Sequence, residues 1–306
     1  MGTIHGRNPT MPDAPLPSTP VATVRKPYAS DLTDDQWAVV QPLLPLDQKR
    51  GRRRTTCLRA VVDALGYITR TGCQWRLLPH DFPHQNTVYD YFAKRNDAGV
   101  LQAVLDTVRK QAREAVARSG EAAPSAALID SQSVKTAGSG GPVGYDGGKK
   151  ITGRKRHLVV DTVGLLLAVA VTAANVDDAA AAPLVLAPLD AARQPRLEVV
   201  WGDQKYWNHA LNAWLAKAQP WTWRLEIVRR PDGAKGFVLL PMRWVVERSI
   251  AWLNRCRRLS KDYERRTDRA EGMVRLSGLG LALRKLRPAS KGQPQWQPPF
   301  RHRLAA

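Results

Sequence analysis

The sequence predicts an α/β protein in which an all-helical N-terminal part precedes a mixed sheet with helices on its faces. Residues 31–120 carry apolar side chains at helical spacing, whereas short β-rich runs alternate with helical segments over residues 126–287. The chain of 306 residues is long enough for about two domains, and its 43% hydrophobic content is enough to bury a core. We therefore expect domains at 31–120 and 126–287, between a flexible leader (1–30) and a loose basic tail (288–306).

Four helices are expected in the first domain. Thr33, followed by Gln36 three residues later, is a capping-box pattern that begins the first helix. Asn86 is the expected N-cap of the third helix. The second and fourth helices should cover about residues 56–70 and 100–118. This arrangement fits a helix–turn–helix unit and an ordinary helical bundle equally well.

The second domain is expected to begin with a single strand and a hairpin and to continue with alternating helices and strands. Val163-Gly164 is the tight turn of the hairpin. The expected strands cover residues 127–134, 156–162, 165–172, 197–202 and 224–230. The expected helices cover residues 177–192, 207–218 and 243–257. This order predicts one mixed sheet covered by helices.

Positive charge is the strongest compositional signal. Lys and Arg number 47 against 27 Asp and Glu, which gives a formal net charge of +20. A protein this basic attracts polyanions, such as nucleic acid or an anionic membrane surface. The apolar run 164–174 is too short to span a bilayer, which needs about 20 residues. The basic residues are not gathered on one amphipathic helix either, so the composition favours nucleic acid as the partner over a membrane.

Three acidic residues stand where an acid is unusual. Asp130 lies within the first expected strand, Asp203 directly follows the fourth, and Glu247 lies within the last expected helix. An acid in a strand built for burial is costly unless it is paired or bound to metal. Two acids at strand ends and one on a facing helix can converge on one point. Taken singly, each also fits a structural role, as a strand cap, a turn residue or a member of a surface ion pair.

Such a trio suits metal-dependent chemistry on phosphodiesters. Two divalent cations about 3.5–4 Å apart can stabilise the attacking and the leaving oxygen, and carboxylates favour a hard ion such as Mg²⁺. The three competing acids have structural explanations, because Asp161 lies at the hairpin turn, and Asp177 and Asp178 lie at a helix N-terminus.

Three groups of basic and polar residues are candidate DNA contacts. A glycine-rich loop at 138–148 leads into a basic run that fits a mobile phosphate clamp or a solvated charge run. The helix around Glu247 carries further arginines, while its Trp244 and Leu253 are expected in the core. By analogy with known docking geometries, the helix after Asn86 is expected to read bases. The candidate contacts are Lys94, Arg95, Lys149, Lys150, Arg154, Lys155, Arg156, His157, Arg243, Arg248, Asn254, Arg255 and Arg258.

Several long motifs occur in order along residues 32–287. They are Leu32-Thr-Asp-Asp-Gln-Trp, Arg70-Thr-Gly-Cys-Gln-Trp, Ile129-Asp-Ser-Gln-Ser-Val-Lys, Lys149-Lys-Ile-Thr-Gly-Arg-Lys-Arg-His, Gly202-Asp-Gln-Lys-Tyr and Arg243-Trp-Val-Val-Glu-Arg. With these motifs the chain resembles bacterial insertion-sequence transposases of the DDE class, in the IS-four/IS-five grouping. The first two motifs are similar to that group's helical DNA-binding domain.

The resemblance implies an RNase H-like catalytic domain that cleaves and joins DNA strands in cut-and-paste transposition. It implies that Asp130, Asp203 and Glu247 hold two Mg²⁺ ions, for which Mn²⁺ can substitute. The implied partners are double-stranded DNA, namely the terminal inverted repeats of an insertion sequence and the target, bound by a homodimer. The implied location is the bacterial cytoplasm, in association with the nucleoid.

The chain departs from the group's pattern at a few positions. Pro241 stands where the group often has Tyr, Asn254 stands where it has Lys, and Gln204-Lys205 stands where small residues are common. None of these changes removes an acid of the trio, so we expect activity to be retained. Two alternatives stay open: a repurposed DNA-binding protein without catalysis, and a nuclease of the same fold that does not join strands.

Overall fold

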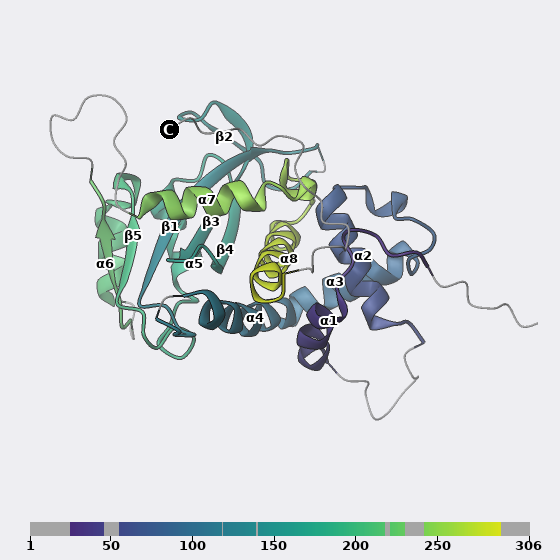
Figure 1. Cartoon of the computed structure of the whole chain (residues 1–306). Helices are drawn as coiled ribbons and strands as arrows, with labels where there is room; N and C mark the ends of the chain where they lie inside the picture. The colour runs from purple at the N-terminus through teal and green to yellow at the C-terminus, as the bar shows by residue number, and fades with distance from the viewer. Residues whose placement is uncertain are drawn as a thin grey trace, which may run out of the picture.

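The computed structural model describes residues 25–45, 55–117, 119–138, 140–217, 221–229 and 242–288. Within these ranges a mixed sheet is covered by helices, and further helices lie beside it (Figure 1). Most of the expected leader and tail, residues 1–24 and 289–306, lies outside the described residues. The expected α/β class is confirmed for the part of the chain that the structure describes.

The described N-terminal part consists of four α-helices and two 3₁₀ turns. They are α1 (Asp34–Val40), η1 (Gln41–Leu43), α2 (Leu58–Thr71), η2 (Trp75–Leu77), α3 (Gln85–Asp97) and α4 (Val100–Val116). The four expected helices are thus present. The capping box of α1 is formed, because the Thr33 hydroxyl accepts a hydrogen bond from the amide of Gln36. The expected last residue of the fourth helix, 118, lies outside the described residues.

The start of α3 differs from the expectation. Asn86 is not the N-cap, because the side chain of His84 takes that role and its Nδ1 accepts from the amide of Asn86 at 3.3 Å. An imidazole nitrogen can satisfy a free amide at a helix N-terminus, as an asparagine oxygen does. The helix therefore begins at Gln85, two residues earlier than an N-cap at Asn86 would place it.

The sheet is built around one long central strand. Its strands are β1 (Ala126–Lys135), β2 (Gly144–Asp146), β3 (Ile151–Asp161), β4 (Leu166–Ala173), β5 (Val199–Gly202) and β6 (Arg224–Ile227). β1 pairs antiparallel with β3 on one side and parallel with β5 on the other. β6 extends the sheet parallel to β5, while β4 and the short β2 both pair with β3. The mixed sheet is therefore confirmed, with the expected hairpin as β3 and β4.

Four further helices and two 3₁₀ turns belong to this part of the chain. They are α5 (Asp178–Leu186), η3 (Gln204–Tyr206), α6 (His209–Lys217), α7 (Arg243–Leu253), η4 (Arg257–Leu259) and α8 (Thr267–Leu286). The largest differences from the expected boundaries are three: β3 begins at Ile151 rather than at residue 156, α5 ends at Leu186 rather than at residue 192, and α7 ends at Leu253 rather than at residue 257. The shifts in β3 and α7 matter for the candidate DNA contacts.

Helix α8 does not follow from the local sequence pattern. It lies between the sheet and the N-terminal helices (Figure 1), and its small residues allow close packing there. A Cβ on Gly272 would lie 2.8 Å from the Phe92 ring, and one on Gly278 would lie 3.0 Å from Leu166. A helix buried on several sides lacks the single apolar stripe that predicts a helix from sequence. No described helix, the 20-residue α8 included, is long and apolar enough to cross a membrane.

Each face of the sheet has its own apolar core. One core joins Leu128 and Leu158 of the sheet to α4, α7, α8 and the N-terminal helices. The other joins Ile129 and Val159 to α5 and α6. Successive side chains of β1 therefore point to different cores, and Asp130 follows Leu128 on the face that α7 covers. The two expected domains share the first of these cores, because α4 packs along α8.

Candidate active site

Two aspartates meet where β1 and β5 run side by side. Leu128 of β1 pairs with Trp201 of β5 in parallel register, and two residues further along each strand stand Asp130 and Asp203. Residues two apart in an extended segment point to the same face, so both carboxylates lie on the side of α7. Each of the two side chains is 18% exposed. The two acids that the sequence places at strand ends are neighbours in the structure.

Arg243, the first residue of α7, joins the two carboxylates. Its Nη2 lies 3.9 Å from Asp130 Oδ2 and 3.5 Å from Asp203 Oδ2. Met242 precedes the helix with a φ of 64°, a left-handed conformation that turns the chain into α7 at this point. One guanidinium thus balances two acids, one on β1 and one just after β5, in the interior of the sheet order. This is a different place from the DNA backbone that the sequence suggested for Arg243.

Backbone amides bind the second oxygen of each carboxylate. Asp130 Oδ1 accepts from the amide of Ser131 at 2.7 Å, and Asp203 Oδ1 accepts from the amide of Lys205 at 3.0 Å. Burial raises the pKa of Asp130 to about 6, and the charge of Asp203 contributes to the rise, while the Ser131 amide and Arg243 oppose it. A bound cation would favour the ionised form of this carboxyl.

Glu247 is not gathered with the two aspartates. Its side chain is exposed, one helical turn after Arg243 on α7. Residues four apart share one face of a helix, so Glu247 and Arg243 lie along the same side of α7. In the described ranges there is no group of three or more His, Cys, Asp or Glu side chains that could hold a metal ion. The oxygen ligands of Asp130 and Asp203 suit a hard cation, but Arg243 competes for the same oxygens.

The basic run at the start of β3 is interior, which corrects its interpretation as a mobile phosphate clamp. Arg154 is 0% exposed and Arg156 is 3% exposed. Arg154 donates from Nη1 to the carbonyl oxygen of Glu264 at 2.7 Å, and Arg156 donates from Nη1 to that of Leu259 at 2.7 Å. The two guanidinium groups bind the chain segment before α8, because carbonyl oxygens there replace the water lost on burial.

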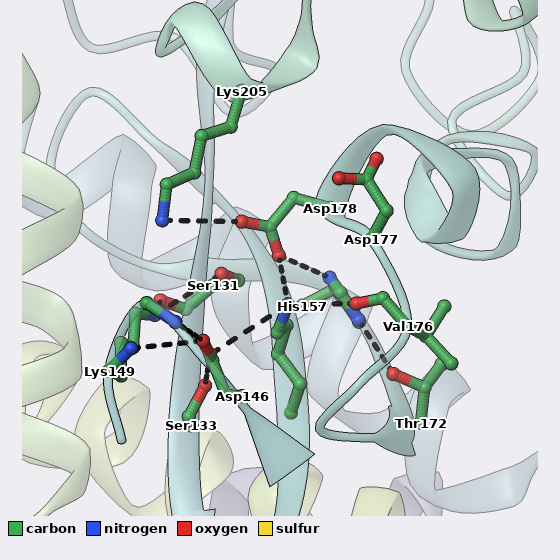
Figure 2. A network of polar contacts seen from close by, with 12 residues as sticks. Ser131, Ser133, Asp146, Lys149, His157, Thr172, Val176, Asp177, Asp178 and Lys205 are labelled. Carbon is green, nitrogen blue, oxygen red and sulfur yellow. Dashed lines mark hydrogen bonds and ion pairs between the residues drawn. The ribbon is translucent and has the colours of Figure 1, made fainter. Parts of the chain in front are cut away.

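The alternate residues of the same run, Lys155 and His157, are buried on the opposite face of the sheet. Figure 2 shows His157 within a polar network. Lys155 Nζ lies 3.1 Å from Asp178 Oδ1. His157 Nε2 lies 3.0 Å from Thr172 Oγ1, and burial lowers the pKa of His157 to about 4, so the ring is neutral at neutral pH. Arg154, Lys155, Arg156 and His157 are therefore structural side chains rather than exposed DNA contacts.

Asp146 is a member of this network that the sequence did not single out. It is buried, and its Oδ2 accepts from the Ser133 hydroxyl at 2.5 Å. Its Oδ1 accepts from the amides of Gly148 and Lys149, each at 3.0 Å, which shapes the turn between β2 and β3. Lys149 in turn donates from Nζ to the carbonyl oxygen of Ser131 at 2.9 Å (Figure 2). The sequence Asp146-Gly-Gly is typical of a turn, and this is the local pattern that could have indicated the turn-forming role of Asp146.

The acids taken as structural from the sequence have structural partners. Asp161 Oδ1 accepts from the amides of Val163 and Leu165 at 3.0 and 2.8 Å, in the turn of the hairpin. Asp177 is the N-cap of α5. Asp178 follows it and is paired with Lys155, and its Oδ2 lies 3.9 Å from Lys205 Nζ (Figure 2).

Residues around the end of α7 differ in their exposure. Asn254 and Arg255 are exposed, whereas Arg258 is 4% exposed and donates from Nε and Nη2 to Glu264 Oε1 at 2.8 and 2.6 Å. Because α7 ends at Leu253 and the chain turns inward through η4, Arg258 is a buried ion-pair residue and not a DNA contact.

The aromatic residues of α7 only partly match the expectation. Leu253 is buried as expected, but Trp244 is 43% exposed, so its assignment to the core is wrong. The Arg248 guanidinium lies 4.4 Å from the ring centroids of both Trp244 and Trp252. Arg248 and Trp252 lie beside the turn between β3 and β4, because Arg248 also donates from Nη2 to the carbonyl oxygen of Val163 at 3.5 Å.

The candidate base-reading helix α3 carries two of the candidate basic residues, Lys94 and Arg95. Lys94 is exposed, and the Arg95 guanidinium lies 4.4 Å from the ring centroid of Tyr91 on the same helix. Lys150 is also exposed, in the turn that precedes β3. DNA contacts by these residues stay a prediction.

Comparison with known proteins gives two family matches. The family described as "Transposase DDE domain" matches residues 121–277, about half of the chain, and "Putative transposase of IS4/5 family" matches residues 32–105. The chain is 33% identical over 148 residues to "Putative transposase for insertion sequence element IS402" of Burkholderia cepacia, an alignment that covers 45% of this chain and 67% of the relative. It is 31% identical over 81 residues to "Uncharacterized protein y4sN" of Sinorhizobium fredii, covering 26% of this chain and 65% of the relative. No solved structure matches.

Proposed function

Because the chain belongs to the DDE transposase family, an enzyme family of phosphodiester cleavage and transfer, we propose that Asp130 and Asp203 are two of its catalytic acids and that Glu247 is the third. The observation that carries this proposal is the meeting of Asp130 and Asp203 at matching positions of two parallel strands. Glu247 is proposed because it lies on the same face of α7 as Arg243, which reaches both aspartates.

The cofactor of this centre is a divalent metal, generally Mg²⁺ in DDE domains. We propose that the three acids hold two Mg²⁺ ions, for which Mn²⁺ can substitute. Bound there, the metal would stabilise negative charge on the attacking and leaving oxygens of the phosphodiester. Two features of the aspartates support this role: their free oxygens face one cationic group, and their other oxygens are held by backbone amides.

Arg243 has a second role in this proposal. Its guanidinium balances the charge of both aspartates, and a cation held by the two carboxylates would take over that charge. A guanidinium freed next to the reacting phosphodiester is well suited to bind a phosphate oxygen of the DNA backbone.

We propose an RNase H-like architecture for the sheet domain. The proposal is supported by the central strand β1, which has the antiparallel strands β3 and β4 on one side and the parallel strands β5 and β6 on the other. In this arrangement the acid on β1 and the acid after β5 are brought together by strand pairing alone.

DNA is the partner that the family implies. We propose that a homodimer binds the terminal inverted repeats of an insertion sequence and then the target, in the cytoplasm of a bacterial cell close to the nucleoid. The net charge of +20 supports binding to a polyanion. The exposed candidates for contacts to DNA are Lys94, Lys149, Lys150, Asn254 and Arg255, together with the partly exposed Arg95, Arg243 and Arg248.

The experiment is cleavage of labelled DNA that carries the element's own end, with Mg²⁺ or with EDTA. Wild type is compared with Glu247→Gln, Asp203→Ala and the matched control Glu114→Gln, an exposed acid of α4. We expect nicking and joined products only with Mg²⁺, in wild type and Glu114→Gln. The two site variants should bind the end without cutting it. Cutting by Glu247→Gln would remove Glu247 from the proposed triad, and binding without cutting in every sample would favour a non-catalytic DNA-binding role.

A further inference from the structure

One guanidinium joins three helices next to the sheet. Arg275 of α8 donates from Nη1 to Asn96 Oδ1 of α3 at 3.2 Å and from Nε to Gln102 Oε1 of α4 at 3.1 Å. Its Nη2 donates to Glu271 Oε2 of α8 at 3.0 Å. The Arg275 side chain is 17% exposed. Because the guanidinium is a rigid planar fork, three bonds from it fix the positions of α3, α4 and α8 relative to one another.

Glu271 continues this link to the sheet. Its Oε2 binds Arg275, and its Oε1 accepts from the backbone amide of Val171 in β4 at 3.1 Å. β4 pairs with β3, and β3 pairs with β1, the strand that carries Asp130. A continuous series of hydrogen bonds therefore runs from Asn96, near the end of α3, to the strand of a proposed catalytic acid.

A second contact holds the same end of α3. The Arg269 side chain is 7% exposed, and its guanidinium binds both carboxylate oxygens of Asp97, with 2.8 Å from Nη2 to Oδ2. Such a two-point pair fixes orientation as well as distance. Asn96 Nδ2 also donates to the carbonyl oxygen of Asp268 at 3.1 Å. A Cβ on Gly272 would lie 2.8 Å from Asn96 Oδ1, so a residue without a side chain lets α8 approach α3 this closely.

These contacts lie directly after the candidate DNA contacts of α3, because Asn96 and Asp97 follow Lys94 and Arg95. Figure 1 shows α8 between the N-terminal helices and the sheet. Units joined only by a linker move relative to one another by default, whereas here hydrogen bonds tie α3 to α8 and α8 to the sheet. One strand of DNA advances about 3.4 Å per nucleotide, so a shift of α3 by that distance would move a cut by one phosphodiester.

We propose that Arg275 and Arg269 are positioning residues that hold α3 at a fixed distance from the catalytic aspartates and thereby select the phosphodiester that is cut. The inference rests on the proposed function of Asp130 and Asp203 and on the predicted DNA contacts of α3. The DNA sequence that α3 binds acts as the reference point, and α8 with the sheet sets the number of nucleotides from it to the cut. Replacement of either arginine therefore changes the place of cleavage rather than the chemistry.

The test is Arg275→Gln in the full chain, with Arg266→Gln as the matched control, because Arg266 is 65% exposed and binds Asp268 two residues away. Two results are read on labelled DNA that carries the element's own end: the footprint of the bound protein and, at nucleotide resolution, the cuts made with Mg²⁺. The footprint should be the same in all three proteins, and wild type and Arg266→Gln should cut mainly at one phosphodiester. In Arg275→Gln the share of cuts at neighbouring phosphodiesters should rise on the order of tenfold, the ratio that a lost coupling of about 1.4 kcal/mol gives.

A charge swap between α3 and α8 tests the second contact at a position that tolerates change. The Asp97 side chain is 54% exposed, so Asp97→Arg should fold, but it places two guanidinium groups against each other and should also spread the cuts. Adding Arg269→Asp restores an ion pair with reversed charges and should restore the single cut position. Asp90→Arg, which makes the same change of charge at an exposed position of α3, controls for the altered charge of the helix.

The outcomes separate this inference from the proposed function. If Arg275→Gln and Asp97→Arg both cut at the wild-type position alone, while Asp203→Ala abolishes cutting, this inference is overturned and the proposed function stands. A footprint that is lost or displaced in these variants would show that the contacts shape DNA binding itself, and it would also overturn the inference. A wild type that does not cut with Mg²⁺ would overturn the proposed function, and this inference with it.

Discussion

Asp130 and Asp203 occupy matching positions of two parallel strands, although one lies within β1 and the other follows β5. Their Oδ2 atoms share one guanidinium, that of Arg243, at 3.9 and 3.5 Å. Two carboxylates that both face one cationic group can exchange it for a metal ion without a change in the strands.

Replacement of Arg243 by Gln should strengthen metal binding in the absence of DNA. The variant leaves two carboxylates without their shared counter-charge, so Mg²⁺ no longer competes with a guanidinium. We expect half-maximal thermal stabilisation at an Mg²⁺ concentration on the order of tenfold lower than in wild type, which corresponds to about 1.4 kcal/mol. The measurement is an unfolding-temperature titration with Mg²⁺, with Arg255→Gln, at an exposed position, as the control. An unchanged or higher Mg²⁺ requirement would contradict the competition.

Replacement of Asp130 by Asn should stabilise the metal-free protein at neutral pH. The folded-state pKa of Asp130 is raised from 3.8 to about 6 by burial, so the native state binds more protons than the unfolded state between these values. Stability therefore falls as pH rises from about 4 to about 6 and is level above that range. At pH 7.5 the variant should be more stable than wild type by about 2–3 kcal/mol.

The check on Asp130 is urea unfolding in EDTA from pH 4 to pH 8. The difference between Asp130→Asn and wild type isolates this group from Asp63, Asp161 and Glu264, whose pKa values burial also raises. The difference should shrink towards zero as pH approaches 4. A difference that does not change with pH would show that Asp130 has no raised pKa.

Two members of one basic run, Arg154 and Lys150, should behave in opposite ways when replaced by Met. Arg154→Met removes a fully buried guanidinium that binds Asp262 and several backbone carbonyls, and should cost about 3–5 kcal/mol of stability. Lys150→Met, at an exposed site, should leave stability within about 0.5 kcal/mol and lower the salt dependence of DNA binding by about one phosphate contact. Urea unfolding and DNA titration at several salt concentrations measure both. Equal stabilities would contradict the interior role of Arg154.

Replacement of Asp178 by Asn should destabilise the fold through Lys155. The side chain of Lys155 is 8% exposed, and its ammonium lies 3.1 Å from Asp178 Oδ1, with Asp146 Oδ2 further away at 3.9 Å. Loss of the nearer carboxylate should cost about 3–5 kcal/mol. The double change with Lys155→Met should recover part of the loss, as a double-mutant cycle would reveal. Asp177→Asn is the neighbouring control, because Asn caps a helix as well as Asp does; a loss of the same size there would argue against the buried pair.

Helix α8 and the burial of residues 154–157 could not be predicted from the local spacing of residue types. Helices α1 to α4 and the strands of the sheet other than the short β2 could be predicted because their apolar spacing repeats within a few residues. Helix α8 could not, because it is packed on several sides and has no single apolar stripe. Trp244 is exposed although a tryptophan is usually buried, and Arg258 is buried although an arginine is usually exposed. The end of α7 and the turn at η4 decide which side each residue faces.

Residue types and their spacing were enough to predict which acids stand at strand ends, that the chain is basic, and that a helical part precedes a mixed sheet. These features depend on residue type and on spacing over a short stretch of chain. The folded chain was needed to show that Asp130 and Asp203 share Arg243, that Glu247 is exposed, and that the side chains of residues 154–157 are interior. The reason is that the partner of a buried charge comes from a distant part of the chain: Arg154 binds the segment before α8, and Lys155 binds the start of α5.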